Sequence, residues 1–476
     1  MKKLITTLYA VIALVTATFA QAGALDSSFN QGAGADGSVI ATSIQSDGRI
    51  IIGGQFTTYN GTARSQIARL NTDGTLDSSF NPGTGAMGGS VLTVSIQSDG
   101  KIIIAGAFTS YNGVARNRIA RLNADATLDL SFNPGTGASG YISATSIQSD
   151  GKIIIGGGFT SYNGTSRIRI ARLNANGSID NTFNPGTGAS SSSISTSVST
   201  IAIQSDGEII IGGEFTAYNG TARSQIARLN TNGTIDLLFN PGTGANSTVF
   251  TSAIQIDGKI IVGGGFTSYN GTARVRVARL NADGSLDGSF NPGTGANNSV
   301  YTSRIQNDGK IIIVGSFTSF NGTSRNSIAR LNADGTLDSA FNPGIGANAY
   351  ITSASIQSDG KIIIGGAFTS YNGAARNYIA RIYEATATGL SLISNSASSS
   401  VYPNPFSFQT TIYTNHFIKD GTLTVYNLKG QVVKEIKNIS GQTLTLFRDN
   451  LPNGLYFIQL VEQNKIITAS KLLITD

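Results

Sequence analysis

The chain of 476 residues contains no cysteine, no tryptophan and one histidine. These counts exclude a disulfide framework, a thiolate metal site and a cysteine nucleophile, and they leave little room for a Ser-His-Asp triad. The formal charge of +6 is spread along the chain, which is too weak and diffuse to indicate nucleic-acid binding. The 58 glycines, set among β-branched runs, indicate many short strands and tight turns.

The N-terminus predicts export. Lys2 and Lys3 precede an apolar run from Leu4 to about Ala20, and Ala20-Gln21-Ala22 fits a small-x-small cleavage pattern. We therefore expect residues 1–22 to be a signal peptide that is cut after Ala22. The alternative is a transmembrane anchor, but the run is short for a bilayer span and no basic stop-transfer flank follows it.

A unit of about 50 residues then recurs seven times. It is marked by an Asp-Gly pair whose aspartate falls at 47, 99, 150, 206, 257, 308 and 359. The spacing is 51 or 52 residues, except for 56 across a Ser-rich insertion within 189–199. A fixed period of this length is typical of propellers and solenoids.

Each unit predicts four short strands. The first is typified by Val39 to Gln45, and an Asp-Gly hairpin turn follows it. The second is the apolar run typified by Lys361 to Phe368, whose composition suits a strand covered on both faces. The third and fourth are typified by Ile328 to Asn332 and by Leu25 to Asn30. Four antiparallel strands per unit match a propeller blade, and no segment of the array has helical periodicity.

The ends of the array predict a closed ring. It begins with a fourth-type strand, Leu25 to Asn30, and ends with a third-type strand, Ile379 to Ile382. The first strand can therefore complete the last blade, which removes two exposed strand edges. We expect an all-β, seven-bladed propeller over residues 23–384, and a stacked β-solenoid remains the alternative.

The pattern IQSDGKIIIGGxF…IARLNADGTLDxSFN resembles the delta-60 repeat, a bacterial β-propeller repeat. The resemblance covers roughly residues 25–383 and recurs seven times. It implies the propeller fold but no particular activity, because the family has no single established one. Three residues depart from the pattern: Gln31 replaces a proline, Ala126 replaces a turn glycine, and Phe320 replaces a loop tyrosine.

Residues 385–400 are rich in Ala, Ser and Thr and predict a linker. Residues 401–476 alternate in hydropathy and predict a small β-sandwich. They resemble the C-terminal sorting domain of the type IX secretion system, and the matching residues are Tyr402, Pro403, Asn404, Pro405, Gly430, Leu451, Gly454, Tyr456, Phe457 and Lys471 to Ile474. The resemblance implies transport across the outer membrane, usually with removal of the domain; the alternative is an ordinary adhesive sandwich domain.

One loop position is aromatic in every unit, and we take it as the candidate ligand-binding site: Tyr59, Tyr111, Tyr162, Tyr218, Tyr269, Phe320 and Tyr371. The loops between second and third strands and between blades should emerge on one face, opposite the Asp-Gly turns. A ring of aromatic side chains there could stack on sugars, beside asparagines that bond their hydroxyls. The alternative is that each ring packs on the neighbouring blade and holds its loop.

Two polar patterns have structural alternatives. The segment Asn281 to Asp287 places oxygen side chains around a glycine, as calcium loops of some propellers do, but an Asp-Gly hairpin explains it without metal. Arg69 and Asp77 recur in every unit, which favours pairs within or between blades over a catalytic role.

We therefore expect a secreted, non-catalytic propeller that binds glycan or protein, without a cofactor. Its predicted partners are the type IX machinery and a surface glycan or protein, and its predicted location is outside a Gram-negative cell, released or attached to the outer membrane. One alternative is an enzyme acting on polysaccharide, which would need a unique set of residues in one blade. The break in symmetry that we identify, the Ser-rich insertion, has no titratable group. A calcium-stabilised display protein is a further alternative.

Overall fold

A computed structural model describes residues 21–384, 400–427, 431–462 and 465–476. The chain divides into two compact units between Thr386 and Ala387. All regular elements in the described residues are β-strands. Within this part of the chain, no helix has the length and hydropathy that a bilayer crossing requires.

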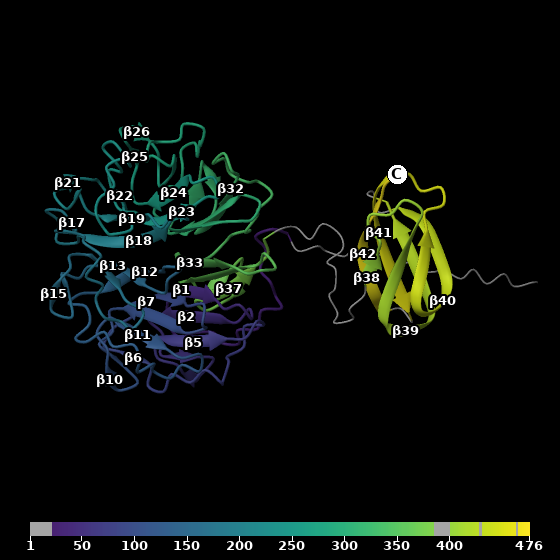
Figure 1. The fold of residues 1–476 in the computed structure, drawn as a ribbon, viewed down its shortest axis with the longest axis horizontal. Coiled ribbons are helices and arrows are strands. Elements are labelled where there is room, and N and C mark those ends of the chain that lie inside the picture. Colours follow the sequence, from purple (N-terminus) through teal and green to yellow (C-terminus); the bar gives the residue numbers. More distant parts are fainter. Residues whose placement is uncertain (1–20, 385–399, 428–430, 463–464) are drawn as a thin grey trace, which may run out of the picture. The chain divides into compact units, whose positions relative to one another are not determined.

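The first unit is a ring of seven blades, and one strand of each blade lies toward the centre of the ring (Figure 1). This inner strand has the bounds β1 (Val39–Ile44), β7 (Val91–Ile96), β12 (Ile142–Ile147), β18 (Ser197–Ile203), β23 (Val249–Ile254), β28 (Val300–Ile305) and β33 (Ile351–Ile356). We number the blades 1 to 7 in this order.

The second strand of each blade is antiparallel to the first and follows the Asp-Gly turn. Its bounds are β2 (Ile50–Gly54), β8 (Ile102–Gly106), β13 (Ile153–Gly157), β19 (Ile209–Glu214), β24 (Ile260–Gly264), β29 (Ile311–Gly315) and β34 (Ile362–Gly366). The third strand pairs with the second and has the bounds β5 (Ile67–Leu70), β11 (Ile119–Leu122), β16 (Ile170–Leu173), β22 (Ile226–Leu229), β27 (Val277–Leu280), β32 (Ile328–Leu331) and β37 (Ile379–Ile382).

A glycine at the end of the second strand, or one residue before it in blade 4, fits a bulge in the first. In blade 1 the register shifts between Val39 and Ala41, opposite Gly54 and Gly53. A Cβ at Gly54 would lie 2.1 Å from the backbone oxygen of Ser38. The same place is glycine in all seven blades, because any side chain would collide with the bulged strand.

The predicted fourth strand is shorter than expected. It is reduced to one antiparallel β-bridge, such as Leu70 with Leu76, and to a bond from the Asp77 amide to the Arg69 carbonyl. The reason is local, since the Asp77 carboxylate accepts hydrogen bonds from the amide and hydroxyl of Ser79 and turns the chain away from the sheet edge. The blades therefore have three full strands and a minimal fourth.

Each long loop between the second and third strands forms a two-residue hairpin. The hairpins are β3 (Thr58–Tyr59) with β4 (Thr62–Ala63), β9 (Ser110–Tyr111) with β10 (Val114–Ala115), β14 (Ser161–Tyr162) with β15 (Thr165–Ser166), β20 (Ala217–Tyr218) with β21 (Thr221–Ala222), β25 (Ser268–Tyr269) with β26 (Thr272–Ala273), β30 (Ser319–Phe320) with β31 (Thr323–Ser324), and β35 (Ser370–Tyr371) with β36 (Ala374–Ala375). The loop between blades pairs with this hairpin, through β6 (Ala86–Met87), β17 (Ala189–Ser190) or a single bridge such as Ala35 with Tyr59. The two loop types therefore share one face, as predicted.

The ring closes by the predicted exchange of strands. Leu25 forms an antiparallel bridge with Ile382, the amide of Asp26 donates to the Arg381 carbonyl, and the amide of Tyr383 donates to the Ala24 carbonyl. The Asp26 carboxylate lies 2.7 Å from Nε of Arg381. The N-terminal segment thus occupies the outer edge of blade 7, where the other blades use residues that follow their own third strand.

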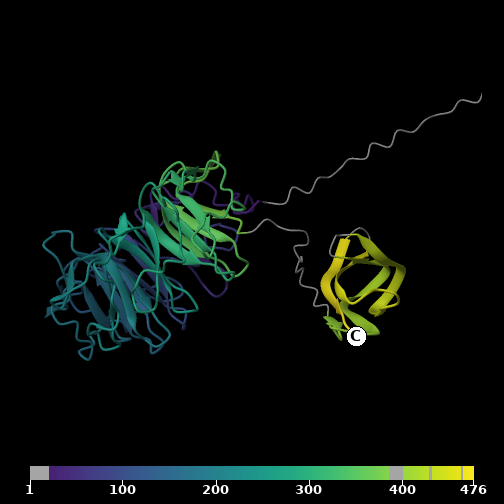
Figure 2. The same cartoon turned by 90° about the horizontal axis from the view of Figure 1, so that it is seen from above.

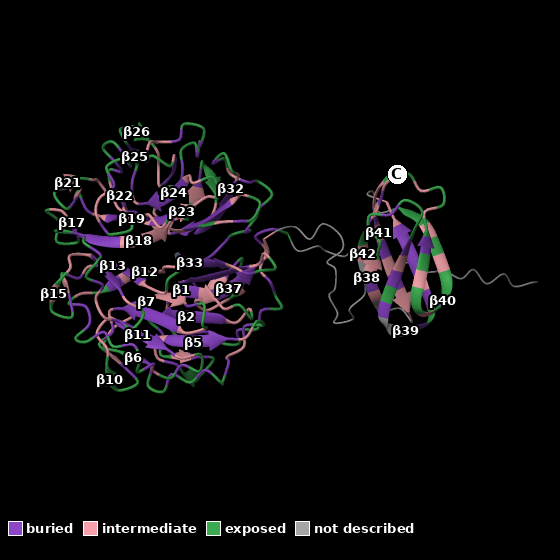
Figure 3. Cartoon of the chain, viewed as in Figure 1, coloured by how far each residue is buried: buried purple, intermediate pink, exposed green. Residues whose placement is uncertain are grey.

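The core of the propeller lies between blades. Ile51 and Ile67 of blade 1, for example, pack in one cluster with Ile102 and Ile104 of blade 2. The last such layer joins Ile363 and its neighbours in blade 7 to blade 1. The second and third strands are buried while the loops are exposed (Figure 3). The continuous apolar runs thus reflect burial on both faces, as expected.

Most of the predicted signal peptide, residues 1–20, lies outside the described residues. The two residues that precede the predicted cut belong to the fold. Ala22 is fully buried in the core between blades 6 and 7, and its carbonyl accepts a hydrogen bond of 2.8 Å from the Asn342 amide. The Gln21 carbonyl accepts from the Ala24 amide. A cut after Ala22 would therefore remove contacts that the ring uses.

The second unit is one sheet of five strands that curls around its own core (Figure 2). The strands are β38 (Ser400–Tyr402), β39 (Gln409–Tyr426), β40 (Val432–Phe447), β41 (Gly454–Glu462) and β42 (Lys465–Ile474). The predicted sandwich therefore takes the form of one continuous sheet, because the long strand β39 pairs with β38, β40 and β41 in turn. A parallel bridge between Phe406 and Ile474 adds a contact to β42.

Asp26→Ala should strongly destabilise the propeller. The substitution leaves the buried Arg381 without its carboxylate, and breaking such a pair costs about 3–5 kcal/mol. Denaturant unfolding should show this loss, together with faster hydrogen exchange at residues 379–382. The control is Asp47→Ala at a half-exposed turn carboxylate, which should cost less than about 1 kcal/mol. Equal, small effects of both substitutions would contradict the closure.

Candidate binding site

The seven aromatic side chains predicted to bind ligand are fully buried: Tyr59, Tyr111, Tyr162, Tyr218, Tyr269, Phe320 and Tyr371. The hydroxyl of Tyr162 donates to the carbonyl of Gly177 in the second turn of the same blade, at 2.8 Å. The other five tyrosines make the equivalent bond. Burial raises the pKa of the Tyr162 phenol well above its usual value.

The expectation that these rings form a sugar-stacking surface is therefore wrong for this conformation, because no ring surface is exposed. The alternative, that each ring holds its loop, describes the structure. The asparagines beside them are also structural. Asn112, at φ 44°, accepts a hydrogen bond of 3.2 Å from the Thr84 amide and so ties the hairpin to the loop between blades. A site has to be sought elsewhere.

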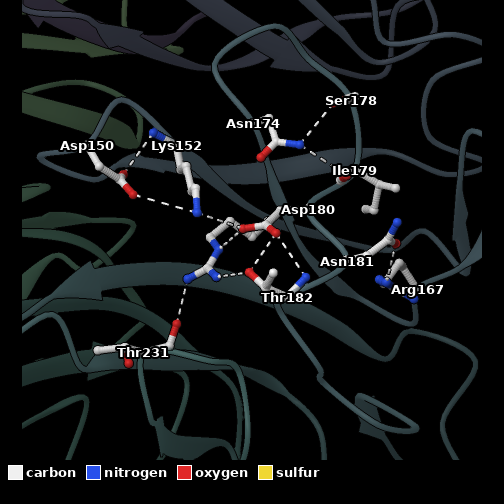
Figure 4. A network of polar contacts seen from close by, with 11 residues as sticks. Asp150, Lys152, Arg167, Asn174, Ser178, Ile179, Asp180, Asn181, Thr182 and Thr231 are labelled. Carbon is white, nitrogen blue, oxygen red and sulfur yellow. Dashed lines mark hydrogen bonds and ion pairs between the residues drawn. The ribbon is translucent and has the colours of Figure 1, made fainter.

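The recurring arginine and aspartate form a structural clamp, as favoured above. In blade 3, Nε of Arg172 lies 2.7 Å from the Asp180 carboxylate, and Lys152 lies 3.1 Å from the same oxygen (Figure 4). Thr182 donates to the other oxygen. Burial alone would raise the pKa of Asp180, but the bonds from Thr182 and the two cations hold it well below its usual value.

The same arginine reaches the next blade. Nη1 of Arg172 donates to the backbone oxygen of Thr231 in blade 4, at 2.5 Å (Figure 4). Every blade makes this contact, through Arg69 to Ala124, Arg121 to Ala175, Arg172 to Thr231, Arg228 to Ala282, Arg279 to Ala333, Arg330 to Glu384 and Arg381 to Thr72. The last contact joins blade 7 to blade 1, so the clamps form a closed circle.

The segment considered for calcium is a hairpin turn whose oxygens have protein partners. Asp283 accepts from the amide and hydroxyl of Ser285, and Asn281 donates to the same hydroxyl. The carboxylate of Asp287 faces Arg279 and Lys259, both within 2.8 Å. In the described residues, no group of three or more His, Cys, Asp or Glu could hold a metal ion. The turn itself accounts for these residues.

The structure instead presents a cavity of about 300 Å³ at the centre of the ring. Its walls are the inner strands of all seven blades. Hydroxyls on these strands bond across blade boundaries, as Thr42 does with Ser355 at 2.8 Å and Thr251 with Ser303 at 3.1 Å. The walls of this central channel are therefore fixed by bonds between blades.

The channel is where the blades differ. One inner-strand position holds Ile40, Leu92, Ser143, Ser199, Phe250, Tyr301 or Thr352, in blade order, and all seven line the cavity; it is the second residue of the strand in six blades and the third in blade 4. The position three residues further along is serine or alanine in six blades and Arg304 in blade 6. The side chains that vary thus converge on one space, which a ring of identical blades would line uniformly.

Aromatic side chains gather at the end of the channel next to the long loops. Phe250 and Tyr301 have ring centroids 5.6 Å apart, and Tyr301 and Tyr350 have theirs 6.3 Å apart, both edge to face. Phe250 and Tyr301 are partly exposed, and Tyr350 is 44% exposed. Tyr141, which precedes β12, is 39% exposed. Partly exposed aromatic rings at a cavity mouth are typical of binding sites.

The sequence carried a signal for this site that we had not used. The Ser-rich insertion is not the one break in symmetry, because aligning the seven inner strands isolates the aromatic Phe250 and Tyr301 and the charged Arg304 at positions that hold aliphatic or small side chains in the other blades. The insertion itself places Ser193 2.8 Å from Glu214 and leaves Ile194 fully exposed, away from the residues that line the channel.

The residues of the predicted sorting signal hold the second unit together. Asn404 donates to the Lys471 carbonyl at 2.7 Å and accepts from the Leu473 amide at 2.8 Å, which fixes the start of the unit to β42. The bonds that precede Pro403 and Pro405 are cis. Tyr456 is buried and its hydroxyl donates to the Pro452 carbonyl.

The remaining matched residues are placed as follows. Tyr402 is exposed, and Gly454 begins β41. Lys471 lies in β42, opposite Phe457 of β41. Gly430 lies outside the described residues.

These features define a seven-bladed β-propeller followed by a C-terminal β-domain. Seven segments match the DUF5122 β-propeller, a domain of unknown function, at residues 45–80, 97–132, 148–183, 204–239, 255–290, 306–341 and 357–382. Together they cover just over half of the chain, which therefore belongs to this family. Residues 400–475 match the secretion system C-terminal sorting domain, so the chain carries a type IX sorting tail. No curated protein matches the chain.

Several solved structures are similar to the chain at low identity. PorZ, a surface component of the type IX secretion system of Porphyromonas gingivalis, is 12% identical with a TM-score of 0.45, over 93% of this chain and 60% of PorZ. The extracellular domain of a hybrid two-component system of B. thetaiotaomicron is 12% identical with a TM-score of 0.42, over 92% of this chain and 56% of that one. A fungal AA5 alcohol oxidase is 16% identical with a TM-score of 0.43, over 94% of this chain and 98% of the oxidase. The chain thus spans less than two thirds of the first two structures.

Phe320→Tyr should stabilise the propeller. Blade 6 lacks the buried hydroxyl that the other blades use, and the new one would reach the Gly335 carbonyl, for a gain of about 0.5–1.5 kcal/mol. Chemical denaturation measures the change. Tyr162→Phe is the matched control and should lose stability, since it leaves the Gly177 carbonyl unpaired. A destabilised Phe320→Tyr variant would refute a holding role for these rings.

Proposed function

We propose that the exported propeller is a non-catalytic carbohydrate-binding module whose site is the aromatic end of the central channel. The observation that carries the proposal is the convergence of variable residues there. Tyr301 and Phe250 replace the serines that blades 3 and 4 have at the same place, and their rings are partly exposed. Rings of this kind stack on the apolar faces of sugars.

The wall of the channel supports the same proposal. Hydroxyl-bearing side chains such as Ser143, Ser199 and Thr352 lie beside the aromatic rings. Their oxygens can accept hydrogen bonds from sugar hydroxyls, while the hydroxyls of Ser143 and Thr352 donate to the carbonyls of Val198 and Val39. The cavity volume of about 300 Å³ is at the lower end of the range for small-molecule sites, which is roughly 300–1,000 Å³. The site therefore suits the end of a saccharide chain better than a whole polymer.

The channel offers little support for glycosidase chemistry. Enzymes that hydrolyse glycosides usually place two carboxyl groups on either side of the bond. The residues that line the cavity carry two ionisable groups, the phenol of Tyr301 and the guanidinium of Arg304. Neither is a carboxyl group, so we favour binding over hydrolysis.

Export places this activity outside the cell. The sorting tail marks the chain for the type IX secretion system. We propose that a signal peptide first directs it out of the cytoplasm, and that the propeller then acts at the outer-membrane surface or after release. In both locations it would meet polysaccharides of the surroundings.

Replacing both rings should weaken glycan binding. Phe250→Ser with Tyr301→Ser copies the residues of blades 3 and 4, so the ring should remain folded. Loss of two stacking contacts should weaken binding by about fivefold to 150-fold, because each aromatic contact contributes about 0.5–1.5 kcal/mol. A glycan array followed by calorimetry measures this.

The matched control is Leu237→Ser with Leu238→Ser. It removes two exposed apolar side chains that do not line the channel, and it inserts the serines that blade 1 has there. Glycan affinity equal in both double variants and the wild type would contradict the proposed site. Binding to proteins but to no glycan would also contradict it.

The structure also leads us to propose a different cleavage point. A cut after Ala20, with Thr18 at the small upstream position, still fits the small-x-small pattern and leaves Gln21 and Ala22 in the fold. Mass spectrometry of the N-terminal peptide of the secreted protein should therefore find Gln21 first. A protein that begins at Gly23, with unchanged thermal stability, would refute this.

A further inference from the structure

Arg304 is the most distinctive residue of the channel. It lies in β28, and the same place in the other blades holds Ser43, Ser95, Ser146, Ala202, Ala253 and Ser355. The side chain is exposed and lines the cavity. Its place is nearer to the Asp-Gly turn than that of Tyr301, three residues earlier in the same strand.

This arginine has no counter-ion. Nη1 of Arg304 donates to the backbone oxygen of Ser303 at 3.0 Å, and no carboxylate of a described residue lies within ion-pair distance. The lining of the cavity holds no Asp or Glu. By contrast, Arg330 in the same blade is paired with Asp338 at 2.8 Å. Arg304 thus leaves an unneutralised charge inside the channel.

The surroundings strengthen the effect of this charge. Although solvent reaches the Arg304 side chain, the surrounding channel walls desolvate the guanidinium and lower its pKa below the usual value, but an arginine remains protonated at neutral pH. Protein walls of low dielectric focus the field of a charge in a narrow cavity. The guanidinium also presents a planar fork of donors that matches the oxygens of a carboxylate or a sulfate.

The distance between the cation and the aromatic end sets the size of the ligand. Three residues along a strand separate Cα atoms by roughly 10 Å. A saccharide end with an acidic group could contact both Arg304 and the ring of Tyr301, and the hydroxyls of the wall lie between them.

We propose that the central channel binds the end of an acidic polysaccharide, with Arg304 bonded to its carboxylate or sulfate group and Tyr301 stacked on a sugar ring. This rests on the proposed function and specifies the class of ligand. Replacing the acidic group with a neutral substituent should lower the affinity of the saccharide, because only an anion neutralises the Arg304 guanidinium inside the channel.

The test compares acidic with neutral oligosaccharides on the full chain by calorimetry at 0.15 M salt. The probes are an oligogalacturonate, a sulfated galactan oligosaccharide and a neutral galactan oligosaccharide of equal length. The acidic probes should bind at least tenfold more tightly than the neutral one. The carboxylate and sulfate arms show which acidic group is preferred.

Arg304→Ser is the informative variant, because serine is the residue of four other blades and should leave the melting temperature unchanged. It should lose the preference for acidic probes, at least tenfold, and keep the affinity for the neutral one. The matched control is Arg223→Ser, which removes a loop arginine that does not line the channel. This control should keep the preference.

The outcomes separate this inference from the proposed function. Equal affinity of wild type and Arg304→Ser for the acidic probes would overturn the inference that the ligand is acidic. If the neutral probe still bound, the proposed carbohydrate-binding function would stand. Absence of binding to all three probes would overturn both. Tighter binding of a poly-glutamate peptide than of either acidic oligosaccharide would overturn the choice of a polysaccharide.

Discussion

The clamp between a buried arginine and a buried aspartate is the interaction on which the rest of the ring depends. Each arginine fixes its own blade through the carboxylate and the next blade through a backbone oxygen, as Arg172 does with Asp180 and Thr231. The circle closes only because Asp26, from the N-terminus, serves Arg381. The inner strands are thereby held in register around one central space.

A ring fixed in this way leaves certain positions free to vary. Residues that bury or pair are nearly the same in every blade, since each performs the same task at a blade boundary. The inner-strand positions of Phe250, Tyr301 and Arg304 are less constrained, because other blades place aliphatic or small side chains there. In this chain, contacting aromatic side chains lie at one end of the channel, and Arg304 lies further along it. Symmetry provides the scaffold, and departures from symmetry provide the candidate site.

The sequence predicts the propeller well because the same strand and turn residues recur in every repeat. The first strand segment, at Leu25, precedes the inner strand of blade 1, and no fourth strand follows the third strand that ends at Ile382. Counting the strands therefore predicts that these two segments pair and close the ring. The ligand-binding aromatics were misjudged because a loop tyrosine looks exposed in sequence, whereas Tyr162 is drawn inward by the Gly177 carbonyl. The channel was not predicted, because treating the equivalent strands of all repeats as one pattern conceals single residues, such as Arg304, that differ between repeats.

The central claim is that the ligand site is the channel and not the outer loops. A crystal structure of the full chain soaked with an oligogalacturonate tests it most directly. We predict density inside the ring, with an acidic group at the Arg304 guanidinium and a sugar ring against Tyr301. Density on the loop hairpins beside Tyr162, with an empty channel, would contradict this account.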